Sequence, residues 1–189
     1  EPLAPKEMSN VNLADQKSLV YKRMYSIEGI SNRFVQLLSS SVLGLLRGTT
    51  VVSSASMRVL KYSEFLLDLV TPTNLNLVAL EPLRGTALFV CDPKLIFAVI
   101  DNMFGGTGKF HAPFDGRSFT KTEQRIIQRL MTVILHDYQK AWEPTYPLQF
   151  KYVRSEMHAT FTDIVMPSDI VIVTSFSLKL GNTGGELQI

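Results

Sequence analysis

The sequence contains a single cysteine, Cys91, among its 189 residues. One cysteine excludes an internal disulfide framework and a cysteine-rich zinc site. Because Cys91 ends the apolar run Ala87–Cys91, we expect it to be a buried structural thiol rather than a nucleophile. The histidines also lack the paired spacing of metal ligands, at His111, His136 and His158. We therefore expect neither a metal nor a cofactor.

The chain also lacks a strong excess of either charge and any long apolar run. Its formal net charge is +2 and its pI is about 8.7. Nucleic-acid-binding domains usually have clustered lysine and arginine and a pI above about 9, so we expect no nucleic-acid partner. No stretch reaches the roughly 18 apolar residues of a membrane span, and the N-terminus lacks a signal-peptide pattern. We expect a soluble, intracellular protein without direct membrane insertion.

Hydrophobic residues make up 46% of the chain, which is enough to bury a substantial core. The first residues, up to about Asp15, hold two prolines and show no periodicity. A helical pattern begins at Gln16 and is expected to stop at Gly48. We interpret residues 1–25 as an N-terminal linker or tail and residues 26–189 as one domain, which we expect to continue beyond Ile189.

Local patterns predict the elements that follow. The stretch Thr50–Val59 is expected to be a strand with one apolar face, formed by Val51, Ala55, Met57 and Val59. Asp92-Pro93 begins one helix, and the capping box from Thr120 to Glu123 begins another. Helices are predicted at residues 62–69, 92–104 and 121–143, and strands at residues 74–80, 86–91, 148–156, 169–180 and from 186 onward, after a turn at 182–185.

These elements repeat in order. Each half has a long helix, a strand, a spacer and a hairpin; the spacer starts at Ser63-Glu64 in one half and at Ser155-Glu156 in the other. The repeat predicts an α/β fold in which a duplicated helix-strand-strand-strand unit is related by a pseudo-two-fold axis. The run 86–91 is apolar on both faces of a strand, so it should be a central strand.

The most unusual stretch is Asp101–Lys109, where a helical pattern meets Gly105, Gly106 and Gly108. Gly105 is sufficient to end the helix, so the other two glycines are interpreted as exposed backbone. Phosphate binding is disfavoured because phosphate loops precede a helix, whereas these glycines follow one. A plain helix-ending turn remains open. We favour a protein-contact loop in which Thr107 lies among the glycines and Phe104 and Phe110 are apolar anchors.

A second candidate surface lies on the helix after the capping box. Lys121, Arg125 and Arg129 recur at four-residue steps and form a basic stripe. One interpretation is an ordinary solvated helix face. The other is a contact with acidic groups of a neighbouring subunit.

The sequence resembles the middle domain of the FliM family of bacterial flagellar motor switch proteins. The resemblance covers residues 26–189 and rests on the stretches Pro72–Leu77, Leu83–Thr86, Asp101–Gly108, Arg117–Arg125 and Tyr152–Met157. It implies a three-layer α/β/α domain similar to the chemotaxis phosphatases CheC and CheX. It also implies that Gly105–Gly108 contacts the middle domain of the rotor protein FliG.

The same resemblance implies a place in the cytoplasmic (C) ring of the motor, peripheral at the inner membrane, where neighbouring FliM subunits pack side by side. Such a protein transmits chemotaxis signals into rotation direction. FliN and phosphorylated CheY would bind through regions outside residues 1–189.

The similarity to CheC leaves one enzymatic alternative, a phosphatase that acts on a phosphorylated response regulator. That class places a Glu and an Asn one turn apart on each long helix. Here Glu28 is followed by Ser31 and Glu123 by Ile126, three positions on. Because neither pair supplies the amide, we expect a protein without enzymatic activity.

Overall fold

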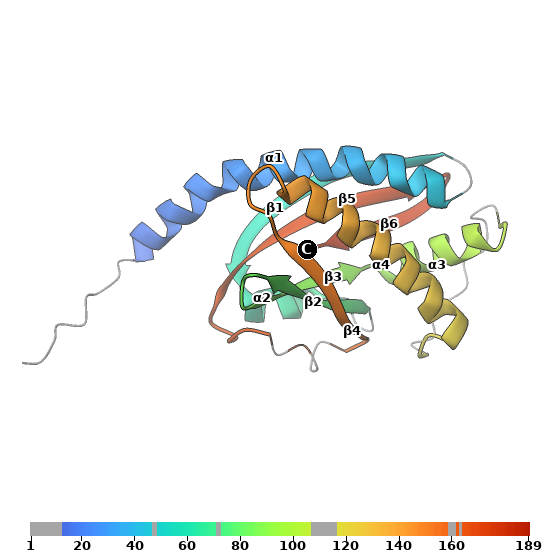
Figure 1. The fold of residues 1–189 in the computed structure, drawn as a ribbon. Helices are drawn as coiled ribbons and strands as arrows, with labels where there is room; N and C mark the ends of the chain where they lie inside the picture. The colour runs from blue at the N-terminus through green and yellow to red at the C-terminus, as the bar shows by residue number, and fades with distance from the viewer. Residues whose placement is uncertain (1–12, 47–48, 71–72, 107–116, 159–161, 163) are drawn as a thin grey trace, which may run out of the picture.

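One antiparallel sheet of six strands organises the computed structural model of the chain (Figure 1). The structure describes residues 13–46, 49–70, 73–106, 117–158, 162 and 164–189. The strands are β1 (Thr50–Lys61), β2 (Asn74–Glu81), β3 (Gly85–Cys91), β4 (Gln149–Glu156), β5 (Ile170–Leu180) and β6 (Thr183–Gln188). They lie side by side in the order β1-β5-β6-β3-β2-β4.

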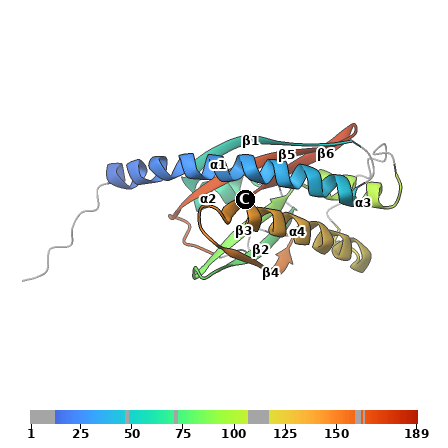
Figure 2. The ribbon, with the colours of Figure 1, turned by 45° about the horizontal axis from the view of Figure 1, so that its top comes forward.

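Helices cover both faces of this sheet. They are α1 (Leu13–Leu45), α2 (Tyr62–Asp68), α3 (Pro93–Met103) and α4 (Lys121–Trp142). The buried side chains of α1, α3 and α4 share one core with one face of the sheet, and those of α2 pack on the other face. Figure 2 shows α1 and α4 together over the first face. The predicted three-layer α/β/α arrangement is confirmed, with a thin third layer consisting of one short helix.

The strand order confirms the predicted duplication. One unit contains β1, β2 and β3, and the other contains β4, β5 and β6. At each edge of the sheet lies the first strand of one unit, and next to it lie the second and third strands of the other unit. The order is thus β1-β5-β6 from one edge and β4-β2-β3 from the other. The pseudo-two-fold axis passes between β3 and β6. As expected, β3 is central, and its residues Leu88–Cys91 are buried.

The shared core joins the two long helices to the sheet. Phe34 of α1 is fully buried and its ring lies edge-on to Tyr138 of α4, with a centroid distance of 5.0 Å. It makes a second edge contact, at 4.9 Å, with Phe176 of β5. Such T-shaped pairs are favourable aromatic geometries. Phe34 therefore joins α1 both to α4 and to the sheet.

Two strand predictions need correction. The structure places a bulge in β1 between Ser54 and Ser56, where β1 has one residue more than β5. A bulge reverses the alternation of side chains. Val51 therefore lies on the opposite face from Met57 and Val59, and the single apolar face predicted for this strand was wrong.

The last strand begins earlier than predicted. The turn lies at Gly181, which has φ +58°, and β6 already starts at Thr183. Gly184 and Gly185 are strand residues rather than turn residues. A Cβ at Gly185 would lie 2.9 Å from the amide nitrogen of Leu95, so this glycine allows α3 to approach the sheet closely. The close approach fixes the position of α3.

At the other end of the chain, α1 begins at Leu13, three residues before the predicted start.

None of the helices in the described ranges combines the length and the apolar composition that a membrane-spanning segment needs.

Candidate protein-contact site

Helix α3 delivers the glycine stretch from the core to the surface. It begins as predicted, because Asp92 accepts a hydrogen bond of 2.7 Å from the amide of Lys94 while Pro93 occupies the first turn. Its inner side is held by buried residues, among them Leu95 and Val99. The direction of the helix is therefore fixed before its last residue, Met103.

The helix ends in a closed hydrogen-bond arrangement. Gly105 has φ +86°, and its amide donates to the carbonyl of Asn102 at 2.9 Å. The amide of Gly106 donates to the carbonyl of Asp101 at 2.8 Å. These two bonds are those of a Schellman motif. The prediction that Gly105 ends the helix is confirmed, but the prediction that Gly106 exceeds the needs of the helix end was wrong.

Gly106 is also closely surrounded. A Cβ at this position would lie 2.1 Å from Oδ1 of Asp101. Its amide donates to the Asp101 carbonyl, so it is not free to bind a partner, and Gly106 is only partly exposed. The exposed part of the corner is Phe104 and Gly105.

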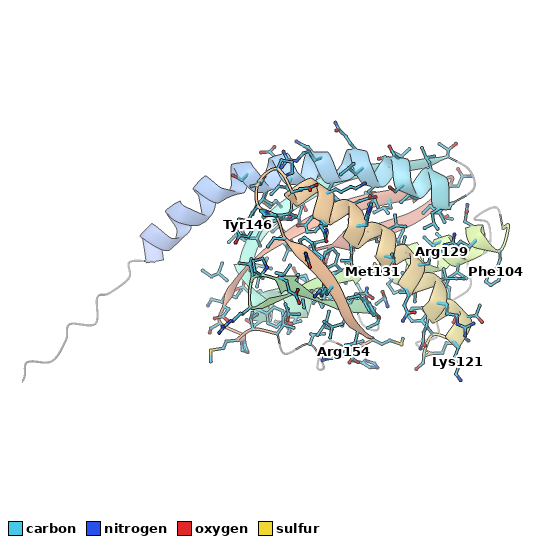
Figure 3. All side chains as sticks on the ribbon, viewed as in Figure 1. Phe104, Lys121, Arg129, Met131, Tyr146 and Arg154 are labelled. Atoms are coloured by element: carbon cyan, nitrogen blue, oxygen red, sulfur yellow. The ribbon has the colours of Figure 1, made fainter. Side chains whose placement is uncertain are left out.

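Phe104 is the apolar group that the corner presents. Its side chain is 69% exposed, directly after a helix whose other large apolar side chains are mostly buried (Figure 3). An exposed aromatic ring on a rigid support is a typical anchor of a protein interface. The remaining predicted contact residues, Thr107, Gly108 and Phe110, lie outside the described residues.

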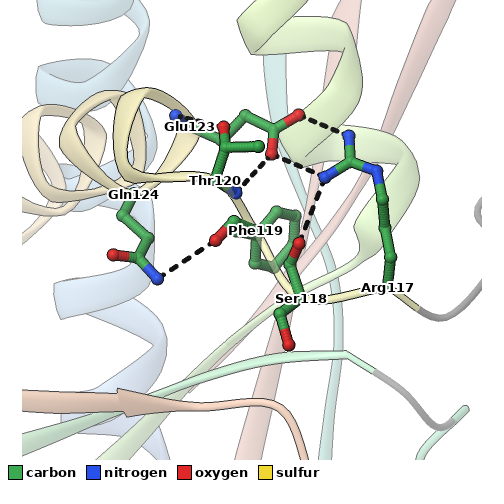
Figure 4. Close-up of polar contacts among 6 residues, drawn as sticks. All are labelled: Arg117, Ser118, Phe119, Thr120, Glu123 and Gln124. Atoms are coloured by element: carbon green, nitrogen blue, oxygen red, sulfur yellow. Dashed lines mark hydrogen bonds and ion pairs between the residues drawn. The ribbon is translucent and has the colours of Figure 1, made fainter.

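Arg117 anchors the start of α4. The Arg117 guanidinium forms two hydrogen bonds with the carboxylate of Glu123, at 2.9 and 2.7 Å (Figure 4). Glu123 also accepts from the amide of Thr120 at 2.7 Å, and its own amide donates to the Thr120 hydroxyl. The predicted capping box is confirmed. The hydrogen bonds from Arg117, with smaller contributions from Thr120, lower the pKa of Glu123 to about 2.

The predicted basic stripe lies on the surface of α4. Lys121, Arg125 and Arg129 are all exposed. Within the described ranges, no acidic side chain forms an ion pair with any of the three. Their charges are available to a partner.

The residues considered for catalysis do not form a site. Glu28 is exposed while Ser31 is buried, and Glu123 is engaged by Arg117 and Thr120. Burial, with the nearby carboxylate of Asp92, raises the pKa of Cys91 to about 12, as expected for a structural thiol. No cluster of metal-binding side chains occurs in the described part of the chain.

Sequence reasoning missed a groove between α4 and β4. It has a volume of about 540 Å³ and is lined by the α4 residues Gln124, Ile127 and Gln128, by Tyr152 of β4, and by Phe119 and Met157. The only signal in the sequence was the pair of glutamines four residues apart on α4. That signal says nothing about how far the helix stands from an edge strand.

Comparison with known proteins places this fold and site in a family. The family model described as Flagellar motor switch protein FliM matches residues 20–189. The Flagellar motor switch protein FliM of Salmonella typhimurium is 43% identical over 175 residues, which are 92% of this chain and 52% of that protein. The chain thus spans about half the length of the curated relatives it matches.

Solved structures agree. The FliM middle domain from Vibrio alginolyticus has a TM-score of 0.77 and 35% identity, over 86% of this chain and 90% of that chain. A chain of the FliG-FliM complex from H. pylori has a TM-score of 0.83 at 23% identity, over 88% and 91% of the two chains, and shows the fold alone. A CheC-like superfamily protein from Shewanella has the same overall fold, with a TM-score of 0.52 at 7% identity, over 85% and 95% of the two chains.

The predicted likeness to CheC is therefore one of fold. The family model and the relative at 43% identity agree on a single family. The chain belongs to the FliM family of flagellar motor switch proteins.

Proposed function

We propose that this chain is a non-catalytic contact module of the flagellar motor switch, in which the corner after α3 binds the middle domain of FliG. The observation that carries the proposal is Phe104, a 69% exposed aromatic side chain held at the end of a buried helix. Thr107, Gly108 and Phe110 extend this contact, and Gly105 gives the partner access to the backbone. The FliG-FliM complex from H. pylori is a precedent within the same fold.

The basic stripe has a second role in this proposal. Lys121, Arg125 and Arg129 contact a neighbouring FliM subunit, so that copies of the domain pack into the cytoplasmic ring. The ring lies at the cytoplasmic side of the inner membrane in the flagellar basal body. FliN and phosphorylated CheY bind other regions of the full-length protein, and rotation direction follows from a shift between two packings of the ring.

A pull-down with the FliG middle domain tests the main contact. Phe104→Ala is expected to reduce FliG affinity by about ten-fold or more, because exposed aromatic anchors contribute much of an interface's energy. The thermal unfolding temperature should hardly change, because the Phe104 side chain is mostly exposed. Leu83→Ala is the matched control, because Leu83 is 48% exposed on the turn between β2 and β3. Equal FliG binding by both variants would remove the corner from the interface.

A further inference from the structure

An arginine of α1 holds the C-terminal end of α4. Arg33 donates from Nε to the carbonyl of Ala141 at 3.0 Å and from Nη2 to the hydroxyl of Thr145 at 2.9 Å. Ala141 lies in the last turn of α4, and Thr145 lies in the segment that follows, residues 143–147, which we call the α4 turn. A cation is favoured at this end of a helix, where the last carbonyl oxygens have no partner within the helix. Figures 1 and 2 show the α4 turn beside α1.

The α4 turn has few other contacts that fix it. The amides of Thr145 and Tyr146 both donate to the carbonyl of Trp142 at 2.8 Å. All residues of the turn are exposed, and Tyr146 is 45% exposed. A segment with exposed hydrogen bonds and few buried apolar contacts can open locally while the rest of the domain stays folded. The two hydrogen bonds from Arg33 are therefore important for keeping the turn closed.

A buried carboxylate lies one helical turn before Ala141. Asp137 is 2% exposed, and its Oδ1 lies 3.4 Å from Nδ1 of His136. Its other oxygen, Oδ2, is buried and has no hydrogen-bond partner in the described part of the chain. A buried polar atom without a partner is unfavourable, and a buried charge without one is more so. Asp137 would therefore be stabilised by a donor, and most of all by a cationic one.

Asp137 lies on the side of α4 that faces α1. Gln128 lines the groove toward β4. Asp137 follows Gln128 by nine positions, which is two and a half turns at about 3.6 residues per turn, so the two lie on opposite sides of the helix. Ala141 lies one turn after Asp137 on the same side. Because Arg33 binds the Ala141 carbonyl, the guanidinium and the buried carboxylate belong to the same seam between α1 and α4.

Arg33 can supply the donor that Asp137 lacks. The neighbouring α1 residue, Phe34, contacts Tyr138 of α4 with a centroid distance of 5.0 Å, which places Arg33 beside this stretch of the helix. A guanidinium has five N–H donors at the end of a long side chain, and a change of rotamer can move it between two acceptors on one helix face. In the described residues, Arg33 forms no ion pair with Asp137.

We propose that Arg33 is a two-position switch, which binds either the α4 turn or the buried carboxylate of Asp137. In the observed position it holds the turn, and Asp137 lacks a partner. In the other position it pairs with Asp137, and the Ala141 carbonyl and the Thr145 hydroxyl lose their donor, so the turn is released. Each position leaves a polar group unsatisfied, which brings the two states close in free energy.

The switch lets the end of α4 detach from α1 while the core stays folded. It includes none of the residues of the proposed FliG contact and none of the basic stripe, so it stands or falls separately from the proposed function.

Hydrogen exchange of the Thr145 and Tyr146 amides, followed by NMR, measures how often the α4 turn opens. Asp137→Asn preserves the shape of the side chain and removes the charge that attracts Arg33. Both amides should then exchange about ten-fold or more slowly, because a charge-assisted hydrogen bond no longer draws Arg33 away from the turn. Asp137→Leu also removes the charge and should slow the exchange in the same way.

The same amides should exchange faster in Arg33→Ala, because the turn loses its hold. The matched control is Lys140→Ala, which removes the exposed basic residue of the last turn of α4 and should change the exchange by less than about two-fold. The amide of Val99, in the buried helix α3, reports changes in global stability in every variant.

The double variant Arg33→Ala/Asp137→Asn distinguishes a switch from two independent effects. If Asp137 acts on the turn only through Arg33, the double variant should exchange like Arg33→Ala alone. The proposal is overturned if neither Asp137 variant slows exchange at Thr145 and Tyr146. It is also overturned if Asp137→Asn slows the exchange equally with and without Arg33, which would mean that the carboxylate acts on the turn directly.

Discussion

Arg117 and Glu123 are joined by two hydrogen bonds, of 2.9 and 2.7 Å, across the residues that cap α4. The Glu123 carboxylate thus completes the capping box and also binds Arg117, which precedes the helix. Glu123 is mostly buried by these contacts, whereas half of the Arg117 side chain is exposed. We therefore expect the Glu123 carboxylate to contribute more than Arg117 to the stability of the N-terminus of α4.

Glu123→Ala is expected to lower the free energy of unfolding by about 1–2 kcal/mol, at the upper range of helix-cap losses. The substitution removes the acceptor of the Thr120 amide as well as the partner of Arg117. Chemical denaturation measures the change. Thr122→Ala, on the exposed side of the same turn, is the control and should stay within about 0.5 kcal/mol of the unmodified chain.

The stability of the domain should also depend on pH through Glu123. Folding lowers the pKa of this carboxyl from 4.5 to about 2, so the folded protein binds the proton less tightly than the unfolded chain. The stabilising contribution is complete above pH 4.5 and is lost as the pH falls toward 2. Unfolding curves should therefore show a smaller acid-induced loss of stability in Glu123→Gln, which cannot titrate. An equal loss in both proteins between these pH values would contradict the assignment.

The single thiol offers a check on the packing of β3. Cys91 is completely buried, and its pKa is raised to about 12, so it holds almost no thiolate at pH 8. Alkylation by iodoacetamide at that pH should be slow in the folded protein and should accelerate on addition of denaturant, in parallel with unfolding. Rapid labelling of the folded chain would show that the centre of the sheet opens locally.

The features that could be predicted from sequence are those with local causes. Asp92-Pro93, the capping box of Thr120 and the left-handed Gly105 each follow from the chemistry of a few adjacent residues. The duplication could be predicted because the order of elements is visible along the chain. The same reasoning also placed Phe104 at the end of a buried helix.

The features that were missed depend on contacts between distant segments. The bulge near Ser54 in β1 is defined by the strand opposite, so alternation within β1 alone predicted the wrong face for Val51. Gly185 resembles a turn residue until α3 is placed against it. The groove at Gln124 exists because α4 and β4 diverge, which no local pattern specifies.

At the corner after α3, the structural role of Gly106 can be separated from a role in binding. A Cβ on Gly106 would overlap the Asp101 carboxylate, so Gly106→Ala should destabilise the domain. We expect a loss of about 1–2 kcal/mol if the Asp101 side chain turns away, within the usual range for a strained substitution. Because the clash requires the carboxylate, Asp101→Ala should remove most of this loss in the double variant.

Denaturation of both single variants and the double variant forms a thermodynamic cycle, and neighbouring residues of this kind typically show coupling of about 0.5–3 kcal/mol. The cycle accounts for any separate cost of removing Asp101. Additive losses would mean that Asp101 and Gly106 do not compete for the same space. If the double variant recovers stability but still fails to bind the FliG middle domain, the surface at these two positions contributes to binding independently of the helix end.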